Sequence, residues 1–219
     1  MLGTIRIYCK NNKQFYEIPC GTSLMELYHI VGIQLPYPVV AARVNYKMQN
    51  LNFLIYKPKD IEFVDASSSA GMRCYVRTLS LVMACAIKEL NEDYDLRIEH
   101  PISKGYFCTI RDKKDNKVTL DTAFIDAIRT RMKQIIAEDR PIETEERQTK
   151  EVIRIFKERH EGETTLFETL GNPYCRYFRM GDYIDYYTGA LMPSSGYLNI
   201  FEIEPYYGDI LLRIPCRKD

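Results

Sequence analysis

The order of periodic segments in the first 66 residues constrains the fold most. Residues 4–8 and 14–18 alternate between apolar and polar side chains, as strands do, and the polar segment 10–13 between them is typical of a hairpin turn. We expect a helix to begin at Gly21-Thr22-Ser23, because a Thr or Ser hydroxyl can accept from the free N–H groups of a first helical turn. Gly32 then suits the left-handed conformation that ends many helices.

Strand-like segments return at residues 39–45, 53–56 and 61–64. Two strands, one amphipathic helix and further strands are the order of a β-grasp unit, in which a single helix lies across a mixed sheet. The small and polar segment that follows is the best candidate for a linker in the chain. We therefore predict a β-grasp domain at residues 1–66, a linker at 67–71 and a second domain at 72–219.

The second predicted domain mixes long helices with strands. Apolar side chains at spacings of three and four predict core-facing helices at about 75–90 and 121–139, and a shorter helix at 149–159. Strand patterns occur at residues 96–98, 106–111, 174–179, 183–187, 198–204 and 209–214. Because helices and strands do not alternate regularly, the predicted class is α+β.

Charge and hydropathy exclude several partners. The 30 Lys and Arg residues balance the 30 Asp and Glu residues, so the formal net charge is zero and DNA is not expected as a partner, although a local basic patch stays open. The longest apolar stretch, near residues 79–87, is shorter than the roughly 20 residues of a spanning helix. No basic and then apolar leader opens the chain. Neither a membrane nor secretion is therefore expected.

Motifs for common chemistry are absent. The sequence has no GxxxxGK[ST] or GxGxxG phosphate loop and no GxSxG nucleophile motif. His29, His100 and His160 are far apart, and the seven cysteines include no CxxC pair, so we expect no metal and no cofactor. Scattered, unpaired cysteines are typical of reduced thiols, and we expect a cytoplasmic protein.

Three segments resemble a known family. They are the helix that ends Ala86-Ile87-Lys88-Glu89-Leu90, the run Arg131–Ile136 and the run Tyr177–Asp185. Together with the order of units, they resemble the N-terminal half of threonyl-tRNA synthetase. There the first domain is the ubiquitin-like TGS domain, and the second is the editing domain shared with alanyl-tRNA synthetase, called SAD or N2. The resemblance covers nearly the whole chain and implies this pair of domains.

The resemblance also implies where chemistry should lie, and there the sequence departs from the family. Family members have HxxxH on the helix and D-x-C-x-G-P-H in a late strand, and these side chains hydrolyse mischarged tRNA. Arg77 and Leu81 stand at the two helix histidines, Tyr187 stands at the cysteine and Leu191 at the last histidine. Leucine can neither bind a metal nor move a proton. We therefore expect a degenerate editing site with no catalytic residue and no metal.

A second resemblance concerns bacterial proteins in which a TGS domain and a degenerate editing-like domain precede a uridine-kinase-like, ATP-binding domain. The run Arg97–Tyr106 resembles that group. This implies a non-catalytic regulatory region with a kinase domain as its downstream partner. Whether the chain itself belongs to an enzyme stays open.

Several residues have two interpretations. Arg77 and Tyr187 either line a rebuilt anion or nucleotide pocket or belong to a filled cleft, with Arg77 solvated or paired to a carboxylate. His100 either contacts a ligand in the old cleft or is a turn histidine satisfied by backbone. Tyrosines and arginines interleave between residues 174 and 187, which suits RNA stacking but also half-buried strands. Asp182 and Asp185 would face opposite sides of a strand, which favours structural roles over an acid/base pair.

Three functions follow from these interpretations. The first is a non-catalytic region that binds RNA, such as a tRNA, or a small-molecule ligand next to a kinase-like enzyme. The second is a free-standing hydrolase that edits mischarged tRNA, and the third is a scaffold whose β-grasp domain docks on a protein partner. The intact frame with substituted chemistry favours the first.

Overall fold

The computed structural model describes residues 3–159 and 164–215. The chain forms two compact units. The first extends to Pro141 and resumes at Gly189, and the second is Ile142–Thr188. Each is described here by itself. The predicted α+β class is confirmed by the four separate sheets and five α-helices of the described residues.

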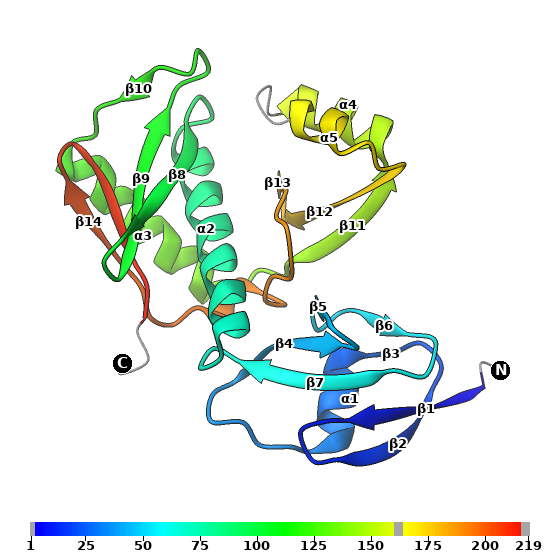
Figure 1. Ribbon diagram of the computed structural model, residues 1–219. Coiled ribbons are helices and arrows are strands. Elements are labelled where there is room, and N and C mark those ends of the chain that lie inside the picture. The colour runs from blue at the N-terminus through cyan, green and yellow to red at the C-terminus, as the bar shows by residue number, and fades with distance from the viewer. Residues whose placement is uncertain (1–2, 160–163, 216–219) are drawn as a thin grey trace. The chain divides into compact units, whose positions relative to one another are not determined.

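The first unit begins with a β-grasp arrangement (Figure 1). Its five-stranded sheet has the order β2-β1-β7-β4-β5, with β1 parallel to β7 and the other neighbours antiparallel. A two-stranded ribbon pairs β3, which leads directly into α1, with β6. The elements are β1 (Thr4–Cys9), β2 (Gln14–Pro19), β3 (Thr22–Ser23), α1 (Leu24–Val31), β4 (Val39–Val44), β5 (Lys47–Gln49), β6 (Leu54–Ile55) and β7 (Asp60–Asp65).

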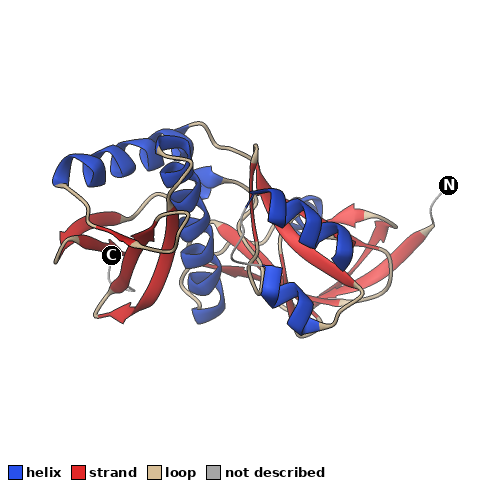
Figure 2. Cartoon of the chain, turned by 90° about the horizontal axis from the view of Figure 1, so that it is seen from above, coloured by secondary structure: helices blue, strands red, loops and turns tan. Residues whose placement is uncertain are grey.

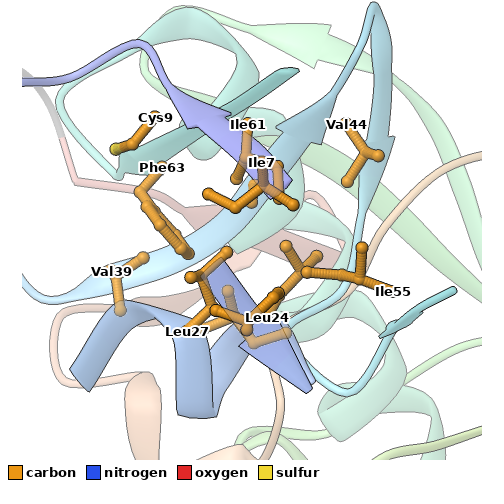
Figure 3. Packing of buried hydrophobic residues seen from close by; sticks show 12 residues of the cluster. Ile7, Cys9, Leu24, Leu27, Val39, Val44, Ile55, Ile61 and Phe63 are labelled. Carbon is orange, nitrogen blue, oxygen red and sulfur yellow. The ribbon is translucent and has the colours of Figure 1, made fainter. Parts of the chain in front are cut away.

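Helix α1 begins and ends as its sequence predicts. Ser23 and Glu26 form a reciprocal capping box, and Gly32 closes the helix at φ 63°. Leu24 and Leu27 are fully buried against the sheet. Figure 3 shows these two leucines together with Ile7, Ile61 and Phe63 in the core of this region.

The chain then turns directly from β7 into α2 (Ser69–Leu90), so residues 69–71 of the expected linker are the first turn of this helix. Ser68 is the N-cap, and its hydroxyl accepts from Gly71 N at 3.0 Å. Asp65 Oδ1 accepts from the Ser67 backbone at 3.0 Å. The helix starts six residues before the predicted 75, because the serines that suggest flexible chain supply the cap. The domain boundaries themselves stay a prediction.

The rest of the first unit is a second sheet with two long helices, which Figure 2 shows beside it. Strand β9 pairs with β8 on one edge and with β10 and β15 on the other, and β14 pairs with β15. Helix α2 packs on β8 and α3, and α3 packs on β14. The elements are β8 (Asp95–Ile102), β9 (Gly105–Arg111), β10 (Lys117–Val118), α3 (Thr122–Ala137), a 3-10 turn (Ser195–Tyr197), β14 (Glu202–Tyr206) and β15 (Asp209–Arg213).

Helix α2 is the apolar centre of this region. By length and composition it could cross a membrane, but 78% of its most apolar 18-residue window is buried inside the protein. Its residues 78–87 are all buried, on every side of the helix. A helix that is apolar all round is a buried helix when other elements enclose it, and α2 is therefore a core helix of the folded first unit.

The second unit is a three-stranded antiparallel sheet, β11-β12-β13, with two helices packed on one another. Its core contains Val152, Phe156, Phe167 and Tyr177. Strand β11 and helix α5 were not expected, because ETEERQ of β11 is entirely polar and has no strand-like alternation. The elements are β11 (Glu143–Gln148), α4 (Thr149–Arg159), α5 (Thr164–Leu170), β12 (Tyr174–Met180) and β13 (Tyr183–Asp185).

Candidate functional site

Helix α2 and the segment 189–192 place three of the predicted positions together. Arg77 and Leu81 are one helical turn apart and share a face of α2. Arg77 Nη1 donates to the carbonyl of Ala190 at 3.3 Å, and Met192 N donates to Thr78 Oγ1 at 2.9 Å. These two hydrogen bonds hold Leu191 beside the helix. We call Arg77, Leu81, Gly189 and Leu191 the α2 site.

The apolar members of the α2 site have no access to solvent. Leu81 and Leu191 each have 0% of their surface exposed. Neither side chain has a donor, an acceptor or a titratable group. The two positions therefore contribute packing, and they cannot supply a general base or a metal ligand.

Arg77 lies directly against the backbone of Gly189. A Cβ built on Gly189 would lie 2.8 Å from Arg77 Cζ, and Gly189 has φ +123°. The backbone conformation favours glycine here, and the absence of a Cβ leaves room for the guanidinium. The guanidinium thus covers the chain at Gly189, and any larger residue would displace it.

The charge of Arg77 is half-buried and is not neutralised by an ion pair. Among residues 3–159 and 164–215, no carboxylate pairs with it. Burial raises the pKa of the neighbouring Cys74 thiol to about 12, although the charge of Arg77 lowers it. Cys74 is therefore a neutral, packed thiol at physiological pH rather than a nucleophile.

The structure places His100 away from the α2 site. His100 lies within strand β8, beside a bulge at residues 98–100, and not in a turn. Its ring packs on Phe107 with 5.4 Å between ring centroids. Phe107 precedes the fully buried Cys108 in β9, so the two side chains point to opposite faces of the sheet. The exposed His100 thus lies on the solvent-facing side of the sheet.

Tyr187 belongs to the second unit. It is half-buried just after β13 and packs edge-on against Phe178, with 6.4 Å between ring centroids. Tyr187 is thus a packed residue of the second unit, next to the end of β13.

Potential metal ligands do not gather in the part of the chain that the structure describes. No group of three or more His, Cys, Asp or Glu side chains there has an arrangement that could hold a metal ion. His160 and Cys216 lie outside the described residues. The six described cysteines are free thiols.

The tyrosines and arginines between residues 174 and 187 are largely engaged within the second unit. Tyr177 is fully buried, and its hydroxyl donates to Glu145 at 2.5 Å. Arg179 pairs with the same carboxylate. Tyr186 packs on Phe167 with 5.1 Å between centroids. The half-buried-strand interpretation therefore describes this segment better than RNA stacking does.

Curated relatives match most of the chain. No family model matches it. A threonine–tRNA ligase of Natranaerobius thermophilus is 31% identical over 183 residues, which are 82% of this chain and 28% of that ligase. The threonine–tRNA ligase of Syntrophomonas wolfei is 28% identical over 91% of this chain and 31% of that ligase. The one from Rubrobacter xylanophilus is 25% identical over 88% of this chain and 29% of that ligase.

Most of this chain is related to part of threonine–tRNA ligase. The chain spans less than one third of the length of these ligases. Its β-grasp sheet and the α+β region built around α2 agree with the two-domain fold expected from the resemblance.

Sequence reasoning missed two residues that build the α2 site. Thr78 Oγ1 accepts from Met192 and donates to the carbonyl of Cys74 at 2.9 Å, and Gly189 accommodates Arg77. For Thr78, the available signal was a polar residue inside a helix that is otherwise predicted to be apolar and buried. For Gly189 the available signal was its place at the glycine of D-x-C-x-G-P-H, although its contact with Arg77 joins segments more than 100 residues apart in the sequence.

Proposed function

We propose that this chain binds tRNA, or an RNA with tRNA-like features, without hydrolysing an aminoacyl ester. The RNA part is supported by relatives that are named as tRNA ligases over most of this chain. The non-hydrolytic part is supported by one observation above all. Leu81 and Leu191 are apolar and fully buried at positions where the resemblance calls for histidines.

Arg77 is the member of the α2 site with the chemistry to contact RNA. A guanidinium presents five N–H donors to phosphate oxygens and always carries its charge. One donor is used by the Ala190 carbonyl, and no carboxylate among the described residues competes for the rest. We propose that Arg77 binds a backbone phosphate of the RNA.

Two assays on the intact chain test this proposal. Incubation with a serine-charged threonine tRNA is expected to release no serine above the buffer blank. In a gel-shift titration at moderate salt, uncharged tRNA is expected to bind, and Arg77→Gln to weaken binding about 5- to 10-fold, as loss of a charge-assisted hydrogen bond does. Arg77→Lys keeps the charge and is expected to lose less.

Arg73→Gln is the matched control, because Arg73 is exposed on the same helix about one turn earlier. It is expected to bind tRNA like the natural sequence. Serine release with turnover would contradict the non-hydrolytic proposal. Absence of a shift at tens of micromolar protein would contradict RNA binding.

We also propose a regulatory role, a location and the absence of a cofactor for this chain. A regulatory role ahead of a nucleoside-kinase-like domain rests on the resemblance of Arg97–Tyr106, and the relatives reported above are all named threonine–tRNA ligase. The coding sequence after Asp219 tests it. A cytoplasmic location and the absence of a cofactor from this region are proposed on the same terms, from the scattered thiols and the missing phosphate loops.

A further inference from the structure

One face of the β-grasp sheet is defined by the alternation of strand β1. Ile7 and Cys9 are at most 1% exposed and point into the core with α1, as Figure 3 shows. Because successive strand residues point to opposite faces, Arg6, Tyr8 and Lys10 lie on the other side of the sheet. That side is not covered by α1.

Aromatic rings and cations alternate on this side. Tyr8 and Phe15 are cross-strand partners with 5.0 Å between ring centroids, and the Arg6 guanidinium carbon lies 4.1 Å from the centre of the Phe15 ring. Lys10 Nζ lies 5.1 Å from the centre of the Tyr46 ring, in the turn between β4 and β5. We call these five residues the open β-grasp face.

Two aromatic side chains of the open β-grasp face are largely exposed to solvent. Phe15 is 59% exposed and Tyr46 is 86% exposed. Helix α2 packs on β4 and β7, where Ala41 and Val64 are buried. These two strands are therefore the part of the sheet that α2 covers. Strands β1 and β2 and the β4–β5 turn keep their outer side chains in solvent. Aromatic rings that gather on one exposed face and are rimmed by polar side chains are typical of binding surfaces.

The charges around these rings favour an anion. Two cations there form ion pairs. Arg43 Nη1 lies 2.7 Å from Glu62 Oε2, and Lys10 Nζ lies 3.9 Å from Asp60 Oδ2. Of the remaining charged residues there, Arg6, Lys13 and Glu17 have no ion-pair partner within 4.0 Å among the described residues. Two unpaired cations against one unpaired carboxylate leave a local excess of positive charge, although the whole chain is neutral.

We propose that the open β-grasp face binds single-stranded RNA, with bases stacked on Phe15 and Tyr46 and phosphates held by Arg6 and Lys13. Every base presents a flat π-surface, and cations beside aromatic rings are the arrangement that such strands require. Paired bases in a duplex hide those surfaces in the helix. An acidic protein segment would satisfy the cations but would leave the rings unstacked.

This surface is separate from the α2 site and does not depend on Arg77. Only the choice of RNA over DNA rests on the proposed function. The two proposals also have different tests. Binding at the α2 site is measured with folded tRNA and Arg77 variants, and binding at the open β-grasp face is measured with a short unstructured strand.

The experiment is fluorescence anisotropy of the full chain with a labelled 12-nucleotide single-stranded RNA of mixed sequence. Phe15→Ala and Tyr46→Ala are each expected to weaken binding roughly 5- to 100-fold, which is the range measured for loss of one stacked base. Tyr46→Phe keeps the ring and is expected to bind like the natural sequence. Arg6→Gln is expected to reduce the salt dependence of the affinity by about one phosphate contact.

Tyr207→Ala and Lys133→Gln are the matched controls. Tyr207 is 89% exposed in the β14–β15 turn, outside the β-grasp region, and Lys133 is exposed on α3. Neither is expected to change the affinity, and an unchanged melting temperature would show that each variant is folded. The proposal is overturned if a 12-base-pair duplex RNA binds as tightly as the single strand. It is also overturned if Tyr207→Ala weakens binding as much as Tyr46→Ala, or if an acidic peptide binds in place of the RNA.

Discussion

At the residue scale, individual contacts decide how close the backbone segments come. Gly71 shows this most directly, because a Cβ added there would lie 1.8 Å from the carbonyl oxygen of Asp65. The side of α2 at its first turn is therefore in contact with the end of β7. A glycine inside a helix is usually unfavourable, so its presence here reflects this packing.

We expect Gly71→Ala to destabilise the protein by about 2 kcal/mol, as overpacking does. In an exposed helix the same change would stabilise by about 1 kcal/mol through helix propensity, so the sign of the effect is informative. Urea unfolding followed by circular dichroism measures it. Gly3→Ala is the control, because nothing lies within 4 Å of a Cβ at that position and stability should not fall.

Glu145 predicts a pH dependence in the second unit. Burial raises the pKa of Glu145, but hydrogen bonds from Arg179, Tyr177 and Arg147 outweigh it and lower the pKa to about 2. Because this folded-state pKa is below the unfolded value, the carboxylate stabilises the fold above about pH 4.5 and the contribution is lost as the pH falls towards 2. The stabilising charge is thus fully present at neutral pH.

We expect Glu145→Gln to lower the free energy of unfolding by about 1–3 kcal/mol at pH 7, as loss of charged hydrogen bonds does. The difference between variant and natural sequence should shrink as the pH is lowered from 5 to 2. Denaturant titrations at several pH values test this. Glu146→Gln removes only an exposed pair with Arg176 and should cost less than about 1 kcal/mol. An equal loss from both variants would contradict the argument.

At the element scale, α2 is the helix on which the first unit is built. It packs against β4, β7, β8 and α3, and it holds the segment 190–192 through side-chain hydrogen bonds. Thr78 has a double role in this arrangement, since its hydroxyl bonds within the helix and to the backbone N–H of Met192.

We expect Thr78→Val to cost about 1–3 kcal/mol of stability, because it leaves the buried N–H of Met192 without an acceptor. Thr130→Val is a matched control, since Thr130 makes the same hydrogen bond one turn back in α3 but is exposed and has no second hydrogen-bond partner among the described residues. Thermal unfolding of the two variants compares them. Equal shifts in melting temperature would mean that the bond to Met192 contributes nothing.

The elements themselves were predictable to different degrees. Helix α4 (Thr149–Arg159) and the cap and end of α1 follow from periodicity and capping residues, which are local signals. The polar strand β11 could not be predicted in this way, because its pairing with β12 decides it. The early start of α2 could not be predicted either, because the Ser68 cap decides it. At the α2 site the sequence located Arg77, Leu81 and Leu191. It could not show that Arg77 lies against Gly189 or that His100 faces solvent, since both depend on tertiary packing.

At the scale of the whole molecule, the neutral net charge conceals local differences. The open β-grasp face has an excess of cations, whereas the second unit uses its charges in ion pairs such as those of Glu145 and Glu146. Function is therefore better inferred from where charges remain unpaired than from their total.

The junction between β7 and α2 also allows a test on the whole chain. A protease that cleaves after small side chains is expected to leave residues 66–71 intact under native conditions, because the Asp65 and Ser68 hydrogen bonds hold this backbone. A variant with Gly-Ser-Gly-Ser inserted after Ser67 should be cut there at once. Early release of the first 66 residues from the natural chain, seen by mass spectrometry, would show a flexible tether instead.

The close contact of Gly71 with Asp65 has a mechanical consequence. Between β7 and α2 there is no slack chain to absorb a pull, so force applied to the β-grasp strands is transmitted along the backbone to the helix that contains Arg77. We therefore expect a load on the β-grasp region to turn α2 with it instead of stretching a flexible linker.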